Sequence, residues 1–123
     1  MPRATAALLV ALGTSWLAPA DALEEKKEGR NPWYGAIAYH HPSGSIGWAT
    51  DRRTSREART EALRQCGHAK CEIVATVTRG CSALAKDSKK FVTQRGTTRA
   101  EAEAKALRRC GERCEIAAWT CTR

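Results

Sequence analysis

The stretch TSREARTEALRQCG at residues 54–67 recurs as TRAEAEAKALRRCG at residues 98–111. Both copies open with a threonine three residues before a glutamate, which is a helix-capping pattern, and both close with Cys-Gly. Glycine accepts the left-handed backbone that ends many helices. Small apolar residues recur between these ends at helical spacing. The sequence therefore predicts two matching helices, each ending at a cysteine.

One face of each predicted helix is made of small apolar residues. The expected buried face is Ala58, Ala62, Leu63 and Cys66 in the first helix and Ala102, Ala106, Leu107 and Cys110 in the second. Because side chains at the contact set how closely a helix approaches its neighbour, alanines here indicate close packing against a sheet.

The segments around the two helices also follow one order. Strands are expected at residues 33–39, 45–49 and 71–78 in the first unit and at residues 81–85, 90–93 and 115–121 in the second. The prediction is an α+β fold of two pseudo-symmetric strand–strand–helix–strand units, at about 33–78 and 80–121, in one small disulfide-stapled domain over residues 33–123. Each helix could cover its own sheet, or the units could pack sheet edges together, and the sequence leaves both open.

The N-terminal segment has the features of a secretory signal. Arg3 precedes an apolar run, and Ala20 and Ala22 occupy the positions that a signal peptidase reads. We therefore predict a signal peptide at residues 1–22 and a flexible charged lead-in at residues 23–32. A membrane anchor is the alternative, but the apolar run is far shorter than the roughly 20 residues of a spanning helix. The expected location is secreted or periplasmic, with no membrane span.

The chain has six cysteines, and all follow the expected cleavage point. Six cysteines in a small exported chain indicate disulfides. Zinc is the rival interpretation, but the spacings do not match paired Cys-x2-Cys motifs and no histidine lies at a finger-like offset. No metal and no cofactor is expected.

The internal repeat also predicts how the cysteines pair. Each helix should be tied to the start of the following strand, by Cys66–Cys71 and by Cys110–Cys114, which leaves Cys81–Cys121. The alternative is cross-unit pairing, Cys66–Cys110 with Cys71–Cys114, which would place the two helix ends side by side.

Several short motifs together resemble a known family. They are the run Trp33-Tyr-Gly-Ala-Ile-Ala, Gly47-Trp48, the Ala-x-x-x-Ala-Leu-x-x-Cys helix and Gly80-Cys-Ser-Ala-Leu-Ala85. This combination resembles the family of domain of unknown function 4189 over nearly all of residues 33–121. The resemblance implies a small exported bacterial protein with a cysteine-rich α+β fold, and it brings no catalytic residues to transfer.

No set of residues in the sequence predicts catalysis. His40 and His41 are adjacent at an expected turn, so their side chains should point to opposite faces and not share a metal. Ser43, Ser82 and Asp87 could be combined with His41, but no spacing demands a triad. We therefore expect no enzymatic activity.

Positive charge is the one distributed signal, with 21 Lys+Arg against 13 Asp+Glu and a net charge of +8. The expected contacts to an anionic partner are Arg52, Arg53, Arg56, Arg59, Lys86, Lys89 and Lys90. We predict a monomeric, non-enzymatic module that binds an acidic protein or an anionic envelope polymer or lipid. Export argues against nucleic acid. The alternatives are a small secreted hydrolase-like effector and a purely structural envelope protein.

Overall fold

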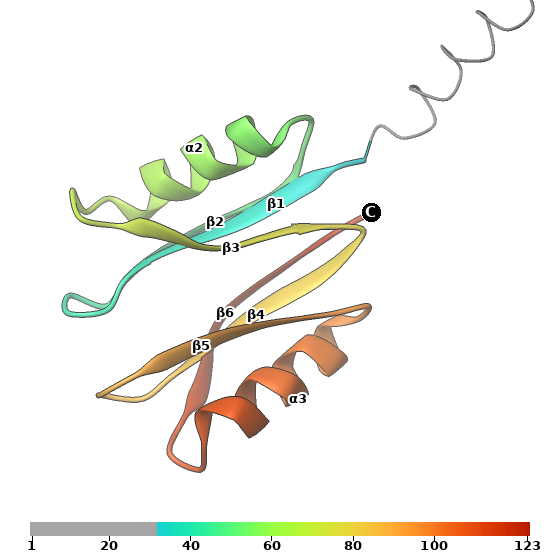
Figure 1. The fold of residues 1–123 in the computed structure, drawn as a ribbon. Helices are drawn as coiled ribbons and strands as arrows, with labels where there is room; N and C mark the ends of the chain where they lie inside the picture. Colours follow the sequence, from blue (N-terminus) through green and yellow to red (C-terminus); the bar gives the residue numbers. More distant parts are fainter. Residues whose placement is uncertain (1–31) are drawn as a thin grey trace, which may run out of the picture. The chain divides into compact units, whose positions relative to one another are not determined.

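The computed structural model describes residues 32–123. The predicted signal peptide and nearly all of the predicted lead-in lie outside these residues. Two strand–strand–helix–strand units follow one another, as the sequence predicts (Figure 1). The elements are β1 (Tyr34–His40), β2 (Ser45–Arg52), α2 (Ser55–Cys66), β3 (Glu72–Thr78), β4 (Gly80–Lys86), β5 (Phe91–Gly96), α3 (Arg99–Cys110) and β6 (Glu115–Thr122).

Each unit builds its own three-stranded antiparallel sheet. The strand orders are β2-β1-β3 and β5-β4-β6, so the first strand of each unit is central. In Figure 1, α2 and α3 lie on the outer faces and the two sheets face each other between them. The layers are therefore helix, sheet, sheet, helix, which decides the arrangement that the sequence leaves open.

The central strands β1 and β4 are buried on both faces. Along β1, Ala36 and Ala38 pack against α2, while Ile37 packs in the cluster between the sheets. Along β4, Ala83 and Ala85 pack against α3, while Leu84 joins the same central cluster. Since strand side chains alternate between faces, small residues lie under each helix and larger ones fill the space between the sheets.

Strands β2 and β5 each end three residues later than the sequence predicts, while the other strand ends agree within one residue. β2 continues to Arg52 and β5 continues to Gly96. Arg52 pairs with Tyr34, and Gly96 pairs with Cys81. Pairing with the central strand therefore extends both strands through polar residues that carry no strand signal of their own.

Both helices begin with the predicted caps. Thr54 Oγ1 accepts a hydrogen bond from the Glu57 N–H at 3.0 Å, and Thr98 Oγ1 accepts one from the Glu101 N–H at 3.1 Å. The Glu57 carboxylate accepts from the N–H of Arg53, one residue before the cap, at 3.2 Å. Within residues 32–123, neither helix has the length and apolar character needed to cross a bilayer.

Leu63 differs from its predicted place in the buried helix face. Ala58, Ala62 and Cys66 are buried, but Leu63 is 38% exposed. The reason is the close approach of α2 to β2, where a Cβ on Gly47 would lie 2.2 Å from the Ala62 carbonyl oxygen. Only small side chains fit beneath a helix at this distance, so leucine is excluded from the contact.

The disulfides are those expected from the repeat. Cys66 pairs with Cys71, Cys110 with Cys114 and Cys81 with Cys121. Cys81 and Cys121 face each other directly in the β4–β6 ladder, with Cα atoms 4.0 Å apart. The cross-unit alternative is therefore wrong.

Candidate functional site

The basic residues predicted to contact a partner fall into two groups at opposite ends of the domain. Arg52 ends β2, and its guanidinium lies 3.9 Å from the Glu61 carboxylate. Arg53 lies over the Trp33 ring, and Arg59 Nη1 donates to Ser55 Oγ at 2.6 Å. Much of this first group, Arg52, Arg53, Arg56 and Arg59, is thus held in local contacts.

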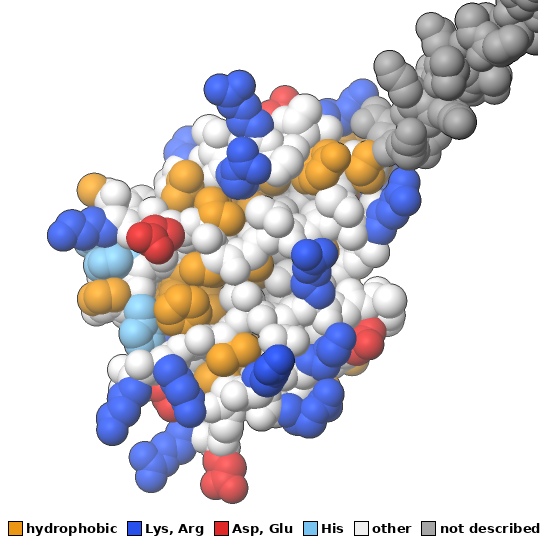
Figure 2. Space-filling view, in the orientation of Figure 1, with side chains coloured by type: hydrophobic (Ala, Val, Ile, Leu, Met, Phe, Trp, Pro, Cys, Tyr) orange, Lys and Arg blue, Asp and Glu red, His pale blue; other side chains and the backbone are white. Residues whose placement is uncertain are grey.

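The second group lies on the β4–β5 hairpin. Asp87 Oδ1 accepts hydrogen bonds from the N–H groups of Lys89 and Lys90 at 2.7 and 2.8 Å. These two backbone bonds, and then the lysine charges, hold the pKa of Asp87 below its usual value of 3.8. The carboxylate therefore braces the turn, while Lys89 and Lys90 stay exposed and Lys86 lies at the end of β4. In Figure 2, Lys and Arg side chains are spread over the visible face instead of forming one patch.

The histidines lie at the hairpin end of the domain. His40 stacks on His68 with ring centroids 4.1 Å apart. His41 instead bonds through Nδ1 to the Tyr39 hydroxyl at 2.8 Å, and its ring lies near Phe91. The two adjacent side chains thus contact different neighbours. Among residues 32–123, no three His, Cys, Asp or Glu side chains are grouped as metal ligands.

We expect His40 to titrate below the usual pKa of 6.5. Burial against its neighbours disfavours the charged ring most, and the positive charges of His68 and Lys70 add to this. The unfolded chain then binds the proton more readily, so this group's contribution to stability falls as the pH drops below 6.5. NMR titration should show the pKa of His40 rising in His68→Ala and unchanged in His41→Ala. A pKa above 6.5 in the wild type would contradict the stacked geometry.

The other residues considered for catalysis do not come together. Ser43 Oγ lies 2.7 Å from Nδ1 of His40, so its histidine partner is His40 and not His41. Ser82 is buried, and its hydroxyl faces the Gln94 carbonyl at 3.4 Å. Asp87 is used in the hairpin turn. The geometry therefore joins none of these three to His41.

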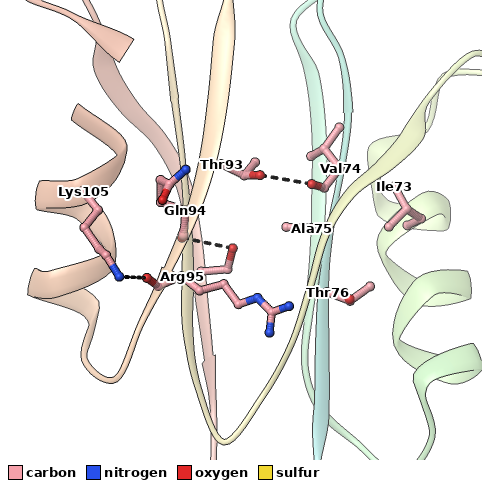
Figure 3. A pocket seen from close by; sticks show the side chains of 9 residues that line it. Ile73, Val74, Ala75, Thr76, Thr93, Gln94, Arg95 and Lys105 are labelled. Atoms are coloured by element: carbon pink, nitrogen blue, oxygen red, sulfur yellow. Dashed lines mark hydrogen bonds between the residues drawn. The ribbon is translucent and has the colours of Figure 1, made fainter. Parts of the chain in front are cut away.

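A hollow of the described domain lies between β3 and β5, the edge strands on one side of the two sheets. We call it the β3–β5 cleft; it has a volume of about 610 Å³ (Figure 3). Its lining consists of Ile73, Val74, Ala75 and Thr76 from β3, Ser82 from β4, Thr93, Gln94 and Arg95 from β5, and Lys105 from α3.

The cleft carries positive charge, and none of its described lining residues is a carboxylate. Arg95 is exposed, and Figure 3 shows its guanidinium reaching across the cleft from β5 toward β3. Lys105 Nζ donates to the Arg95 carbonyl at 2.9 Å and lies 3.9 Å from Glu101. The hydroxyl group of Thr76 adds a polar contact. This set of donors suits an anionic group.

The two lateral sides of the domain carry different side chains at equivalent positions of the repeat. Trp48 in β2 and Trp119 in β6 lie on one side of the domain. In the repeat, Thr93 in β5 corresponds to Trp48, and Thr76 in β3 corresponds to Trp119. On the β2–β6 side, the two tryptophans line a smaller hollow of about 310 Å³. On the β3–β5 side, the two threonines leave more space. Sequence reasoning missed the cleft, and its one signal was this replacement of tryptophan by threonine within the repeat.

The domain is thus a disulfide-bonded α+β fold with two facing sheets and a basic cleft at one side. The family model described as Domain of unknown function (DUF4189) matches residues 34–121, and the chain belongs to this family. The NMR structure of Rv1813c from Mycobacterium tuberculosis is similar, with 40% identity and a TM-score of 0.61. The match covers 72% of this chain and 74% of that one. A comparison with curated proteins gives no significant match.

Proposed function

We propose that this protein is an exported, non-enzymatic binding module that takes an anionic partner in the β3–β5 cleft. The observation that carries the proposal is the lining itself, which offers Arg95 and Lys105 with no carboxylate among its residues. The partner would be an acidic protein or an anionic component of the cell envelope. The three disulfides are in keeping with an oxidising compartment outside the cytoplasm.

The electrostatics of the whole chain support this assignment. A net charge of +8 attracts an anionic partner over a distance comparable with the Debye length, about 8 Å at physiological ionic strength. Arg95 then supplies a planar guanidinium that can bond two carboxylate or phosphate oxygens at once. The predicted lysines Lys89 and Lys90 precede β5 and extend the positive charge along that strand.

Charge reversal at Arg95 tests the proposal. Poly-L-glutamate and phosphatidylglycerol vesicles are used as probes, and wild-type binding should weaken as salt is added. We expect Arg95→Glu to weaken binding roughly tenfold or more, because it removes a donor and places a repelling charge in the cleft. Binding is measured by titration calorimetry or by sedimentation with the vesicles.

Arg113→Glu is the matched control. It makes the same change in net charge at an exposed residue between α3 and β6, outside the lining of the cleft. It should change affinity by less than about threefold, which long-range attraction accounts for. Equal weakening by both variants, or no binding of either probe by the wild type, would overturn the assignment to the cleft.

A further inference from the structure

One lateral side of the two-sheet stack is bridged by side chains. There, β2 contacts β6, and Thr50 Oγ1 lies 2.7 Å from Thr120 Oγ1. Thr120 Oγ1 also donates to the Ala49 carbonyl at 3.0 Å, and Arg123 bonds to Asp51. The edges of β2 and β6 are therefore bridged to each other by side chains.

On the other side, β3 is an irregular edge. Its register with β1 shifts between Ile37 and Ala38, and Val74 is left without a partner residue. The carbonyl of Val74 instead accepts a hydrogen bond from Thr93 Oγ1 at 3.2 Å (Figure 3). Ala117 is skipped in the same way in β6. Such a bulge interrupts the row of backbone groups that a further strand would need.

The β5 edge, in contrast, is regular. Its register with β4 runs from Cys81–Gly96 to Lys86–Phe91 without a shift, unlike the other three strand pairs of the described domain. Within residues 32–123, strand β5 pairs with β4 only, so its second edge borders the β3–β5 cleft. A regular edge of this kind is a template for adding a strand.

The hairpin turn shows which backbone groups of β5 point to that edge. The Asp87 N–H donates to the Lys90 carbonyl at 3.0 Å, so these two residues form a hydrogen-bonded pair. Hydrogen-bonded and non-bonded pairs alternate along an antiparallel ladder. Phe91, Thr93 and Arg95 therefore direct their N–H and C=O groups away from β4. The bond from Lys105 Nζ to the Arg95 carbonyl agrees with this assignment.

We infer that the anionic partner is an acidic polypeptide segment, which adds to the Phe91–Arg95 edge of β5 as an extended strand. This rests on the proposed function and names the partner class. Lys89 and Lys90 lie before the edge, while Arg95 and Lys105 lie near its other end. A strand rises roughly 3.3 Å per residue, so several residues of an added peptide can form backbone hydrogen bonds along this edge. Cations lie near both ends of the edge. The Arg95 carbonyl already accepts from Lys105 Nζ, which leaves the N–H and C=O groups of Phe91 and Thr93 for a partner. Charge complementarity favours acidic side chains, and these backbone groups match the backbone of an extended peptide.

Amide hydrogen exchange gives the most direct test. The probe is a synthetic peptide of about ten residues that alternates glutamate and threonine. Binding should slow exchange at the amides of Phe91 and Thr93, which face the free edge. The amides of Val92 and Gln94 already bond to β4 and should change little. Binding that changes neighbouring amides without this alternation would overturn strand addition.

A proline variant provides a second test. Thr93→Pro removes an edge N–H, and proline is tolerated on edge strands where the N–H faces away from the ladder. The control Thr93→Val keeps that N–H but removes the hydroxyl that bonds to Val74. We expect the proline variant to bind the peptide roughly tenfold more weakly than the valine variant, because one backbone bond is lost.

Backbone methylation of the peptide keeps the test decisive if Thr93→Pro does not fold. Methylating alternate peptide nitrogens blocks the donors that face β5, so one of the two methylated registers should lose binding to the wild-type protein. Equal binding of both registers, with affinity still lowered by Arg95→Glu, would overturn strand addition and leave the anion-binding cleft standing. Vesicle binding without peptide binding would do the same. Failure of poly-L-glutamate, vesicles and peptide alike would overturn both proposals.

Discussion

Replacing Gly47 with alanine is expected to lower the free energy of unfolding by about 3 kcal/mol, close to the upper end for overpacked sites. A Cβ at this position would lie 2.2 Å from the Ala62 carbonyl oxygen and 2.3 Å from the Cys66 nitrogen. Both contacts are to the backbone of α2, so no side chain can rotate away. The helix would have to move outward, and the contacts of Ala58 and Ala62 with the sheet would open.

Gly44→Ala separates this close approach from the loss of a glycine as such. A Cβ on Gly44 meets nothing within 4 Å, but the residue has a φ of +78°. Alanine there should cost about 1 kcal/mol, through backbone strain alone. Urea denaturation of both variants measures the difference. Equal losses would show that α2 moves away from β2 without a significant energetic penalty.

Removing the Cys81–Cys121 disulfide should have the second large effect. The bond joins residues 40 positions apart, so the chain-entropy estimate gives about 4 kcal/mol. The double variant Cys81→Ala with Cys121→Ala is therefore expected to lose more stability than a double variant that removes either of the other two disulfides. The tight pairs close loops of 5 and 4 positions and should cost about 2–3 kcal/mol each.

Chemical denaturation of the three double variants, without reductant, ranks the disulfides. The first unit supplies a comparison, because Tyr34 and Thr78 face each other where Cys81 and Cys121 do in the second. The first unit thus forms its sheet without this bond, and we expect the Cys81–Cys121 variant to fold to the same structure with lower stability. A smaller loss than in the Cys66–Cys71 variant would contradict the loop-length argument.

Much of each unit could be predicted because its signals are local. The cap at Thr54 is set by Glu57 three residues away, and the helix ends at Gly67, which has a φ of +70°. The pairing of Cys66 with Cys71 spans one short loop. Side-chain alternation along β1 likewise follows from strand geometry. Because the sequence repeats, the same kinds of prediction apply to the second unit.

The sequence misjudged positions where a distant segment decides the packing. Leu63 belongs to the apolar face of its helix, but Gly47 on another element brings the two backbones too close for it. Strand pairing likewise decides where the two expected basic clusters lie, because the fold places Arg52 and Lys89 at opposite ends of the strands. Both outcomes depend on how strands pair, which neither segment encodes alone.

The sequence by itself determined the two units, their helix caps, their disulfides and the family. The tertiary structure alone decided that the two sheets face each other, that side chains bridge one side and that the other side opens into a basic cleft. Thr50 and Thr120 are 70 residues apart, and Thr93 and Val74 belong to different units. Local patterns specify turns and faces, because those depend on neighbouring residues. The cleft and the free edge of β5 depend on the packing of one unit against the other, which only the folded chain sets.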